Sequence, residues 1–243
     1  MANKNLETLF LMPGNWKDLE DFSKKLSEIS PQKYYYEKNA IQDIESRKSM
    51  RVEWHDPLKE WGEFFASSKK VSISQKQIES YSEMPMISVH GKTSSISEAQ
   101  HLVDLIGSLF SCGGQGVKIV HSGVFYTQDE WKKFKFDRSE DLLDVFVPIY
   151  YSSRGAFSCG MQHFGLPDVF VQSNDRQQDM FMAENFVWYL YSQSPRIKEG
   201  DFFSLKNGAP KYKIQFKAKD FLFPDHHDLY NTYGTIELVL ESL

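Results

Sequence analysis

Residues 86–120, MISVHGKTSSISEAQHLVDLIGSLFSCGGQGVKIV, decide the fold of this chain. Residues 86–90 form a short apolar run of the kind that predicts a strand. Ser95 and Glu98 then have the spacing of a capping box, in which the two side chains satisfy backbone N–H groups at the start of a helix. The apolar residues beyond them repeat at the spacing of one helical face: Ala99, Leu102, Val103, Ile106, Leu109 and Phe110.

The same stretch also marks where this helix ends. Gly113 and Gly114 follow the apolar stripe, and glycine adopts the left-handed conformation of a helix C-cap at the least cost. Residues 117–120 are apolar again and predict the next strand, so the stretch is a β-α-β unit. An earlier segment has a similar order, with an apolar strand at 9–12 and a helix at 18–29, but its residues do not match well enough to indicate a repeat.

Further strands and helices follow without the regular alternation of a doubly wound fold. The sequence predicts helices after Asp56 and Asp175 and strands at 50–54, 143–151, 157–160, 168–171, 212–216 and 236–240. Strands outnumber helices toward the C-terminus. This pattern favours an α+β fold with a largely antiparallel sheet and helices packed on one face, and it leaves open two β-α-β-containing subdomains.

A polar segment rich in Ser and Lys is the predicted boundary within the chain. It predicts an N-terminal α/β subdomain at residues 1–66, a junction at 67–84 and a C-terminal α+β domain at 85–243. One continuous domain is the alternative, because 243 residues are enough for either arrangement.

Composition excludes several classes of protein. The chain has 28 Lys and Arg against 33 Asp and Glu, a net charge of −5, and 41% apolar residues, which are ordinary values for soluble proteins. The pI of about 5.8 and the shortness of the basic clusters argue against a nucleic-acid partner. No apolar stretch has the roughly 20 residues of a membrane helix, and the N-terminus does not resemble a signal peptide. We therefore expect a cytoplasmic protein that does not bind a membrane.

One decapeptide carries a family resemblance. Residues 160–169 read GMQHFGLPDV, and they fit the pattern G-M-x-x-F-G-x-P-[DE] over residues 160–168. An aromatic-rich helix, a segment at 198–203 and a Tyr-Asn-x-x-Gly element at 230–234 follow it. In these features the chain resembles a bacterial family catalogued as a domain of unknown function. The resemblance implies a cytoplasmic bacterial protein and attaches no activity to it.

The decapeptide has two interpretations. Its glycines and Pro167 give a loop of defined shape, because glycine permits positive φ and proline fixes φ. In the structural interpretation the loop packs Met161 and Phe164 into the core. In the functional interpretation the loop presents a set of polar side chains for binding: Gln162, His163 and Asp168.

Polar and aromatic residues near the C-terminus extend this candidate site. The candidate binding residues there are Tyr230, Asn231 and Tyr233. The densest cluster of metal-ligand residue types directly precedes them and consists of Asp225, His226, His227 and Asp228. Neighbouring residues seldom point at one metal ion, and Pro224 indicates a turn. We therefore predict an exposed polar loop there, with no metal or cofactor.

Other catalytic motifs do not fit this sequence. Gly113, Gly114 and Gly116 follow a predicted helix rather than open one, which is the wrong order for a phosphate-binding loop. Cys112 and Cys159 lack both the spacing of zinc ligands and the surroundings of a nucleophile. The chain has more aromatic residues than the alternating pattern of buried and exposed strand positions would bury. This surplus indicates a protein interface, and its members are Tyr34, Tyr35, Tyr36, Trp54, Trp61, Trp131, Tyr230 and Tyr233.

These observations favour a non-catalytic protein-binding module over an enzyme. Its concrete form would be an immunity or inhibitor protein that binds a toxin or effector through surface complementarity. The alternative is a small-molecule or metal-binding protein, or a hydrolase, with a site near residues 160–168 and 225–234.

Overall fold

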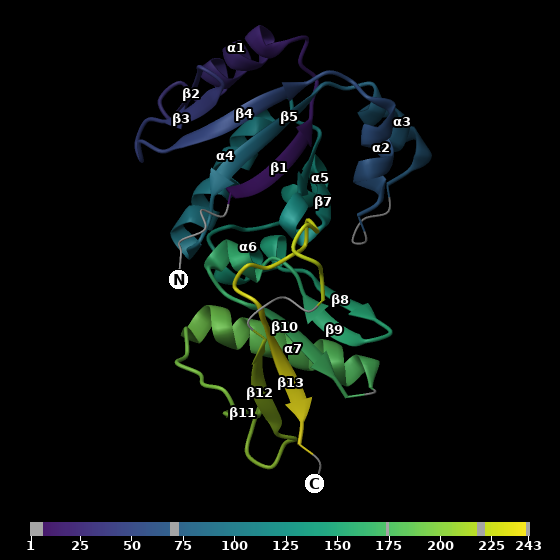
Figure 1. Cartoon of the computed structure of the whole chain (residues 1–243). Helices are drawn as coiled ribbons and strands as arrows, with labels where there is room; N and C mark the ends of the chain where they lie inside the picture. The colour runs from purple at the N-terminus through teal and green to yellow at the C-terminus, as the bar shows by residue number, and fades with distance from the viewer. Residues whose placement is uncertain (1–6, 69–72, 174, 218–221, 242–243) are drawn as a thin grey trace. The chain divides into compact units, whose positions relative to one another are not determined.

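The computed structural model describes residues 7–68, 73–173, 175–217 and 222–241 of the chain (Figure 1). The chain forms two compact units, which divide between Arg138 and Ser139. Residues 69–72 of the predicted junction lie outside the described residues, and so do residues 1–6, where the sequence predicts no signal peptide. No described helix is both long and apolar enough to cross a membrane.

The N-terminal unit contains a seven-stranded sheet, counted over the described residues, in the order β2-β3-β4-β5-β1-β6-β7. Every neighbouring pair in this sheet is antiparallel. Its strands are β1 (Glu7–Pro13), β2 (Tyr34–Glu37), β3 (Ala40–Asp43), β4 (Ser49–His55), β5 (Met86–Lys92), β6 (Gly116–Ile119) and β7 (Val124–Thr127). The helices of this unit are α1 (Leu19–Ile29), α2 (Lys59–Ala66), α3 (Gln75–Ser82), α4 (Ile96–Ser111) and α5 (Gln128–Trp131), with a 3-10 turn at Val120–Ser122.

The predicted β-α-β unit is confirmed as β5, α4 and β6, with β1 between the two strands. Ser95 caps α4 by accepting a hydrogen bond from the Glu98 N–H at 3.3 Å. The Glu98 carboxylate reaches one residue further back than a capping box requires and accepts from the Ser94 N–H at 2.8 Å. Gly113 follows the helix with φ +120°. β1 and β4 flank β5 on its two sides, and α1 and the hairpin of β2 and β3 connect them, so this connection interlocks with the first unit as in a split β-α-β pair.

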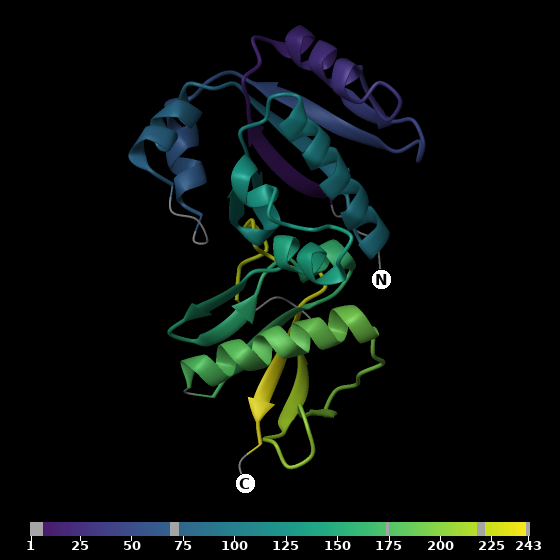
Figure 2. The same ribbon diagram turned by 180° about the vertical axis from the view of Figure 1, so that it is seen from behind.

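Helices cover the two faces of this sheet unequally. Phe22 of α1 packs edge-on against Tyr36 of β2, with 5.7 Å between ring centroids. His101 of α4 packs against Tyr34 of the same strand, with 6.3 Å between ring centroids. Tyr34 and Tyr36 are two residues apart in β2, so α1 and α4 cover the same face of the sheet. α4 crosses in front of the sheet in Figure 2. Leu11 points to the opposite face and packs with buried residues around α2 and α3: Phe65, Tyr81, Met86, Val120 and Phe125. The predicted packing on one face therefore holds for α1 and α4, while α2 and α3 cover part of the other face.

The sheet shows why the polar segment at 67–84 does not divide the chain. β4 precedes this segment and β5 follows it, yet the two strands pair directly, with Arg51 opposite His90. The segment is an excursion from one sheet, and its helix α3 buries only Tyr81, while its other residues are exposed or half-buried. The observed division lies instead after Arg138, so it differs from the predicted one at 1–66, 67–84 and 85–243.

The C-terminal unit contains a six-stranded sheet, again over the described residues, in the order β11-β12-β13-β10-β9-β8. β10 and β13 run parallel, and the other pairs are antiparallel. Its strands are β8 (Ile149–Ser152), β9 (Gly155–Ser158), β10 (Asp168–Gln172), β11 (Phe202–Phe203), β12 (Tyr212–Lys217) and β13 (Thr235–Leu240). Its helices are α6 (Ser139–Phe146) and α7 (Arg176–Gln193), with a 3-10 turn at Met161–Phe164.

The second sheet is also covered on both sides. α7 crosses one face (Figure 2), where Phe186 packs against Phe203 at 4.7 Å between ring centroids. The other face carries a small apolar cluster in which strand residues meet the segment before β13: Phe157, Cys159, Phe170, Leu222, Phe223 and Leu229. This cluster brings the segment that contains residues 222–234 onto the sheet, next to the decapeptide.

Two local predictions differ from the structure. Residues 143–146 were predicted as the beginning of a strand but belong to α6, because an apolar run in which Leu142, Leu143, Val145 and Phe146 are all buried fits a helix as well as a strand. The pattern also does not predict the hairpin of β2 and β3. That hairpin turns at Lys38 and Asn39, whose φ values are 50° and 62°, and a two-residue hairpin turn needs such positive values.

Candidate functional site

A buried carboxylate holds the decapeptide loop. Asp168 begins β10 and is 2% exposed. One of its oxygens accepts hydrogen bonds from the Ser158 hydroxyl at 2.8 Å and from the Met161 N–H at 3.2 Å. The Ser158 hydroxyl oxygen in turn accepts from the Val169 N–H at 2.8 Å. The carboxylate therefore ties β9, the 3-10 turn and β10 together.

Asn231 joins the C-terminal loop to this carboxylate. Its Nδ2 donates to the second oxygen of Asp168 at 2.8 Å and to the Leu166 carbonyl at 3.1 Å. Its Oδ1 accepts from the Tyr233 N–H at 2.8 Å. The structure thus brings Asp168 and Asn231 together, as a site near 160–168 and 225–234 requires, but both side chains are buried.

Gln162 and His163 lie in the core rather than on a surface. The His163 ring is fully buried and packs 4.8 Å from the ring of Phe146. Gln162 is 1% exposed, and its side-chain amide has no hydrogen-bond partner among the described residues. The two apolar side chains of the loop are buried as well, Met161 and Phe164. The polar residues of the decapeptide therefore present no binding surface, and the loop's geometry fits the structural interpretation.

The metal-ligand candidates lie on exposed turns. Asp225, His226, His227 and Asp228 are all exposed. His227 stacks on Phe223 with 4.7 Å between ring centroids, and its Nδ1 accepts from the Leu229 N–H at 3.0 Å. Within the described ranges, no group of three or more His, Cys, Asp or Glu could hold a metal ion. The remaining candidate residues follow in the same loop, where Tyr230 is half-buried and Tyr233 is exposed.

Both cysteines are buried free thiols. Burial raises the pKa of the Cys112 thiol to about 12, which keeps it protonated at neutral pH. Because the thiolate is the reactive form, we expect neither Cys112 nor Cys159 to react with dithionitrobenzoate at pH 8 in the native protein. Both should react after unfolding in urea, as measured by the released thionitrobenzoate. Labelling of the native protein within seconds would contradict this burial.

A polar cluster that the sequence patterns missed lies on the face of the N-terminal sheet that α2 and α3 partly cover. The Ser88 hydroxyl lies 2.9 Å from His55 Nε2 and 3.5 Å from His90 Nε2. Arg51 donates to His90 Nδ1 at 3.0 Å, which makes Nε2 the protonated nitrogen of a neutral His90. The Ser88 hydroxyl can then donate to His55, as in a nucleophile–base pair. However, Ser88 lies in the middle of β5, between β4 and β1, where backbone N–H groups are engaged in the sheet rather than available to an oxyanion.

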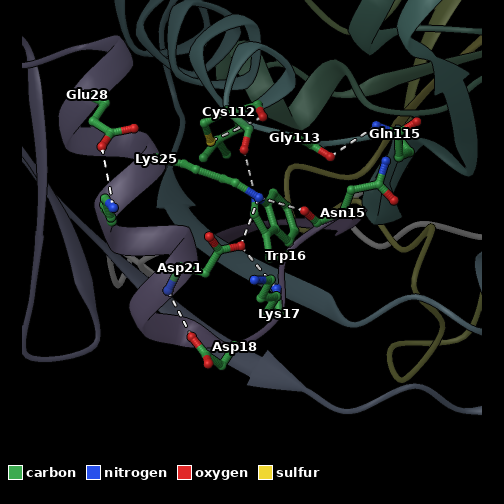
Figure 3. A network of polar contacts seen from close by, with 12 residues as sticks. Asn15, Trp16, Lys17, Asp18, Asp21, Lys25, Glu28, Cys112, Gly113 and Gln115 are labelled. Carbon is green, nitrogen blue, oxygen red and sulfur yellow. Dashed lines mark hydrogen bonds and ion pairs between the residues drawn. The ribbon is translucent and has the colours of Figure 1, made fainter.

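A buried tryptophan joins the ends of α1 and α4 (Figure 3). Trp16 Nε1 donates to the carbonyl of Cys112, at the C-cap of α4, at 2.8 Å. Its ring packs edge-on against Phe22 of α1, with 5.2 Å between ring centroids. Figure 3 also shows Lys25 of α1 reaching back along this ring, where its Nζ donates to the Asn15 carbonyl at 2.9 Å. These contacts fix the spacing between the two helices at this end of the unit.

The surface of α4 beside α1 holds an open groove of about 470 Å³. Part of its lining is small side chains of α4, namely Gly107, Ser108 and Ser111. Ile29, at the end of α1, lines it too and is 44% exposed. Trp131 and Phe136 contribute aromatic rings from the segment after β7, and these two rings pack 5.1 Å apart. The groove therefore combines a small-residue floor with large apolar side chains on its flanks.

Positive charge gathers beside the aromatic flank of this groove. Residues 131–138 contain four cations against one carboxylate, Asp137. The cations are exposed, and they are Lys132, Lys133, Lys135 and Arg138. Within the groove Lys33 and Asp104 form an ion pair at 3.2 Å, so their charges compensate each other. Lys132 lies 3.8 Å from Asp129 Oδ1, and residues 128–138 together contain four cations against three carboxylates, so the positive excess beside the groove is small.

The described fold does not explain why position 107 of the groove is a glycine. It lies in the middle of α4, where glycine costs about 1 kcal/mol relative to alanine. Among the described residues, no heavy atom beyond its chain neighbours and its own helical backbone comes within 4 Å of the place a Cβ would take. Elsewhere the fold does need glycine, since a Cβ at Gly116 would lie 2.2 Å from the Phe125 ring. A side chain at position 107 would therefore meet open space at the groove that Gly107 lines.

The groove is the candidate functional site of this chain. Its apolar flanks and its glycine floor are features of surfaces that receive a helical segment of another protein. No sequence pattern predicts it, although a glycine inside an otherwise regular apolar helix is a signal that can be read. The resemblance of residues 160–168 to a bacterial family stays a prediction, because no protein-family model, curated protein or solved structure matches the chain.

Proposed function

We propose that this chain is a non-catalytic bacterial protein-binding module that holds a helical segment of its partner in the groove between α1 and α4. The observation that carries the proposal is the open space at Gly107. A glycine in a helix interior lowers stability, and nothing in the described fold compensates for it. Clearance for a partner explains why this position has no side chain.

The lining of the groove favours a helix as the bound segment. Val103, Gly107 and Ser111 are four residues apart on α4 and so form one ridge of its surface. Helices pack with axes about 8–10 Å apart, and small side chains on a ridge permit the closer distances. Ile29 and Phe136 flank this ridge and contact the apolar face of the incoming helix.

The charges beside the groove favour an acidic partner. The cations of residues 131–138 adjoin the aromatic flank, where they attract carboxylates at the edge of a docked helix. Such rim charges contribute mainly to the association rate and to the choice of partner, and salt screens them. Binding should therefore weaken as the NaCl concentration rises.

The concrete form of this function is an immunity or inhibitor protein of a toxin or effector in the bacterial cytoplasm. Such a protein acts by covering its target and needs a complementary surface rather than catalytic groups. The burial of Gln162, His163 and Asp168 supports this reading over a hydrolase or a small-molecule or metal-binding protein with its site near 160–168 and 225–234.

Two substitutions at one position test the groove. The tagged wild-type chain and its Gly107→Ala and Gly107→Trp variants are used to capture proteins from a lysate of the source bacterium, and mass spectrometry identifies what they retain. We expect wild type and Gly107→Ala to retain the same protein. The tryptophan variant should lose at least about 90% of it, because an indole at position 107 occupies the groove where apolar contacts of a partner dominate the binding energy.

The alanine variant is also the control for folding. It should raise the free energy of unfolding in urea by about 0.5–1 kcal/mol, since alanine favours the helix and meets no neighbour at this position. The tryptophan variant should unfold at a urea concentration no lower than that of wild type. A captured protein that binds all three forms equally would exclude the groove as its interface, and the absence of any stoichiometric partner would overturn the proposed function.

A further inference from the structure

The loop that joins β11 to β12 contains an asparagine followed by a glycine, and Asn207 is the only asparagine of the sequence in that position. The loop turns between Lys206 and Ala209, where the Ala209 N–H donates to the Lys206 carbonyl at 3.1 Å. The Ser204 hydroxyl lies 3.0 Å from the same carbonyl and 3.2 Å from the carbonyl of Ala209. Asn207 and Gly208 are therefore the two central residues of a hydrogen-bonded turn.

Nothing holds the two central residues of this turn against a neighbouring group. Both are exposed. Within the described part of the chain, neither the Asn207 side chain nor the Gly208 N–H takes part in a hydrogen bond. Gly208 has φ +81°, and no heavy atom beyond its chain neighbours lies within 4 Å of the place a Cβ would take. The side-chain amide of Asn207 can therefore approach the Gly208 nitrogen without displacing another group.

We infer that Asn207 is a site of spontaneous deamidation, the reaction that makes asparagine a thermally labile residue. The Gly208 nitrogen loses its proton to hydroxide and attacks Cγ of Asn207, which glycine permits because it has no Cβ to shield that nitrogen. The new N–Cγ bond closes a five-membered succinimide ring, the bond from Cγ to Nδ2 breaks, and the leaving amide takes up a proton and departs as ammonia. Water then opens the ring, at the side-chain carbonyl to give aspartate or at the main-chain carbonyl to give isoaspartate.

The reaction changes both the charge and the backbone of the turn. Either product replaces a neutral amide with a carboxylate, so the net charge of −5 becomes more negative by one. Isoaspartate also lengthens the main chain inside the turn by one methylene group, which is incompatible with the hydrogen bond from Ala209 to Lys206. Gly208 lines a hollow of about 600 Å³ together with Leu240 at the end of β13, so the reaction alters one wall of that hollow. The site is independent of the groove and of the proposed protein partner.

Peptide mass spectrometry of the full chain, incubated in its native state at pH 6 and at pH 9, tests this inference. We expect the peptide with Asn207 to be converted to two products of equal, slightly higher mass, which chromatography separates as aspartate and isoaspartate forms. The conversion should be faster at pH 9, because it begins with loss of the Gly208 amide proton. Asn39 is the internal control, since it is also exposed in a tight turn but precedes Ala40, which pairs with Glu37. Its peptide should stay unchanged over the same time.

Two variants of the turn separate this reaction from general degradation of the loop. Gly208→Ala should slow the conversion of Asn207 at least about tenfold, because a methyl group then shields the attacking nitrogen. Ser204→Ala removes a hydroxyl from the same turn but leaves both reacting groups in place, so its conversion should be no slower than that of wild type. Equal rates in wild type and Gly208→Ala would overturn the inference, and so would an Asn207 peptide that stays as unchanged as the Asn39 peptide at pH 9.

Discussion

Replacing Asp168 with alanine is expected to lower the free energy of unfolding of the C-terminal unit by about 3–5 kcal/mol. The substitution removes the acceptor for the Ser158 hydroxyl, the Met161 N–H and the Asn231 amide, all at a buried position. Each buried donor left without a partner costs about 1–3 kcal/mol. Since Asn231 also loses its anchor, the segment leading into β13 should loosen at the same time.

Urea denaturation followed by circular dichroism measures this loss, and hydrogen exchange assigns it to the C-terminal unit. Asp168→Asn should cost less than Asp168→Ala, because one amide oxygen can still accept from Ser158 and Met161 while its NH2 group opposes that of Asn231. Asp228→Ala changes an exposed carboxylate and should stay within about 0.5 kcal/mol of wild type. If Asp168→Ala is as stable as Asp228→Ala, the network does not hold the loop.

The central β-α-β unit could be predicted because its signals are local. Ser95 and Glu98 mark the start of α4, the apolar stripe marks its buried face, and the two glycines mark its end, all within 35 consecutive residues. The same locality explains the error at 143–146. Periodicity over four apolar residues does not distinguish a buried helical turn from a buried strand, and the deciding contacts come from the rest of the unit.

The burial of the decapeptide's polar residues could not be predicted from the residues themselves. Asp168 is a buried structural acceptor because Asn231, 63 positions away, donates to it and because β13 lies beside β10. A parallel pairing between strands so far apart in the chain leaves no local signal. The sequence therefore indicates the correct pair of segments, 160–168 and 225–234, but not whether they meet in the core or at a surface.

The groove lay beyond sequence reasoning for a related reason. The groove depends on what is missing at Gly107, and an absent side chain has meaning only once its surroundings are known. The surplus of aromatic residues included Trp131, which lines the groove but is itself buried, so that prediction of a protein interface stays untested.

Replacing Trp16 with alanine is expected to cost about 3–5 kcal/mol of unfolding free energy, the range observed for removing a large buried aromatic ring. The ring is 4% exposed and contacts Phe22 of α1 and Trp54 of β4. It also lies flat on Gly14, where even a Cβ would come within 2.4 Å of ring carbons. The substitution removes these contacts and leaves a cavity in place of the ring, which is the source of the expected cost.

Trp16→Phe separates the hydrogen bond from the ring. Phenylalanine keeps most of the apolar contact with Phe22 but leaves the Cys112 carbonyl without its donor, so we expect a smaller loss of about 1–3 kcal/mol. Circular dichroism in urea measures both variants without relying on tryptophan fluorescence. A loss below about 1 kcal/mol for Trp16→Ala would contradict the role of this ring as the connection between α1 and α4. Trp16→Ala should also lower partner capture, although Gly107 and Ile29 of the groove are unchanged. The reason is that α1 is then no longer held at a fixed distance from α4.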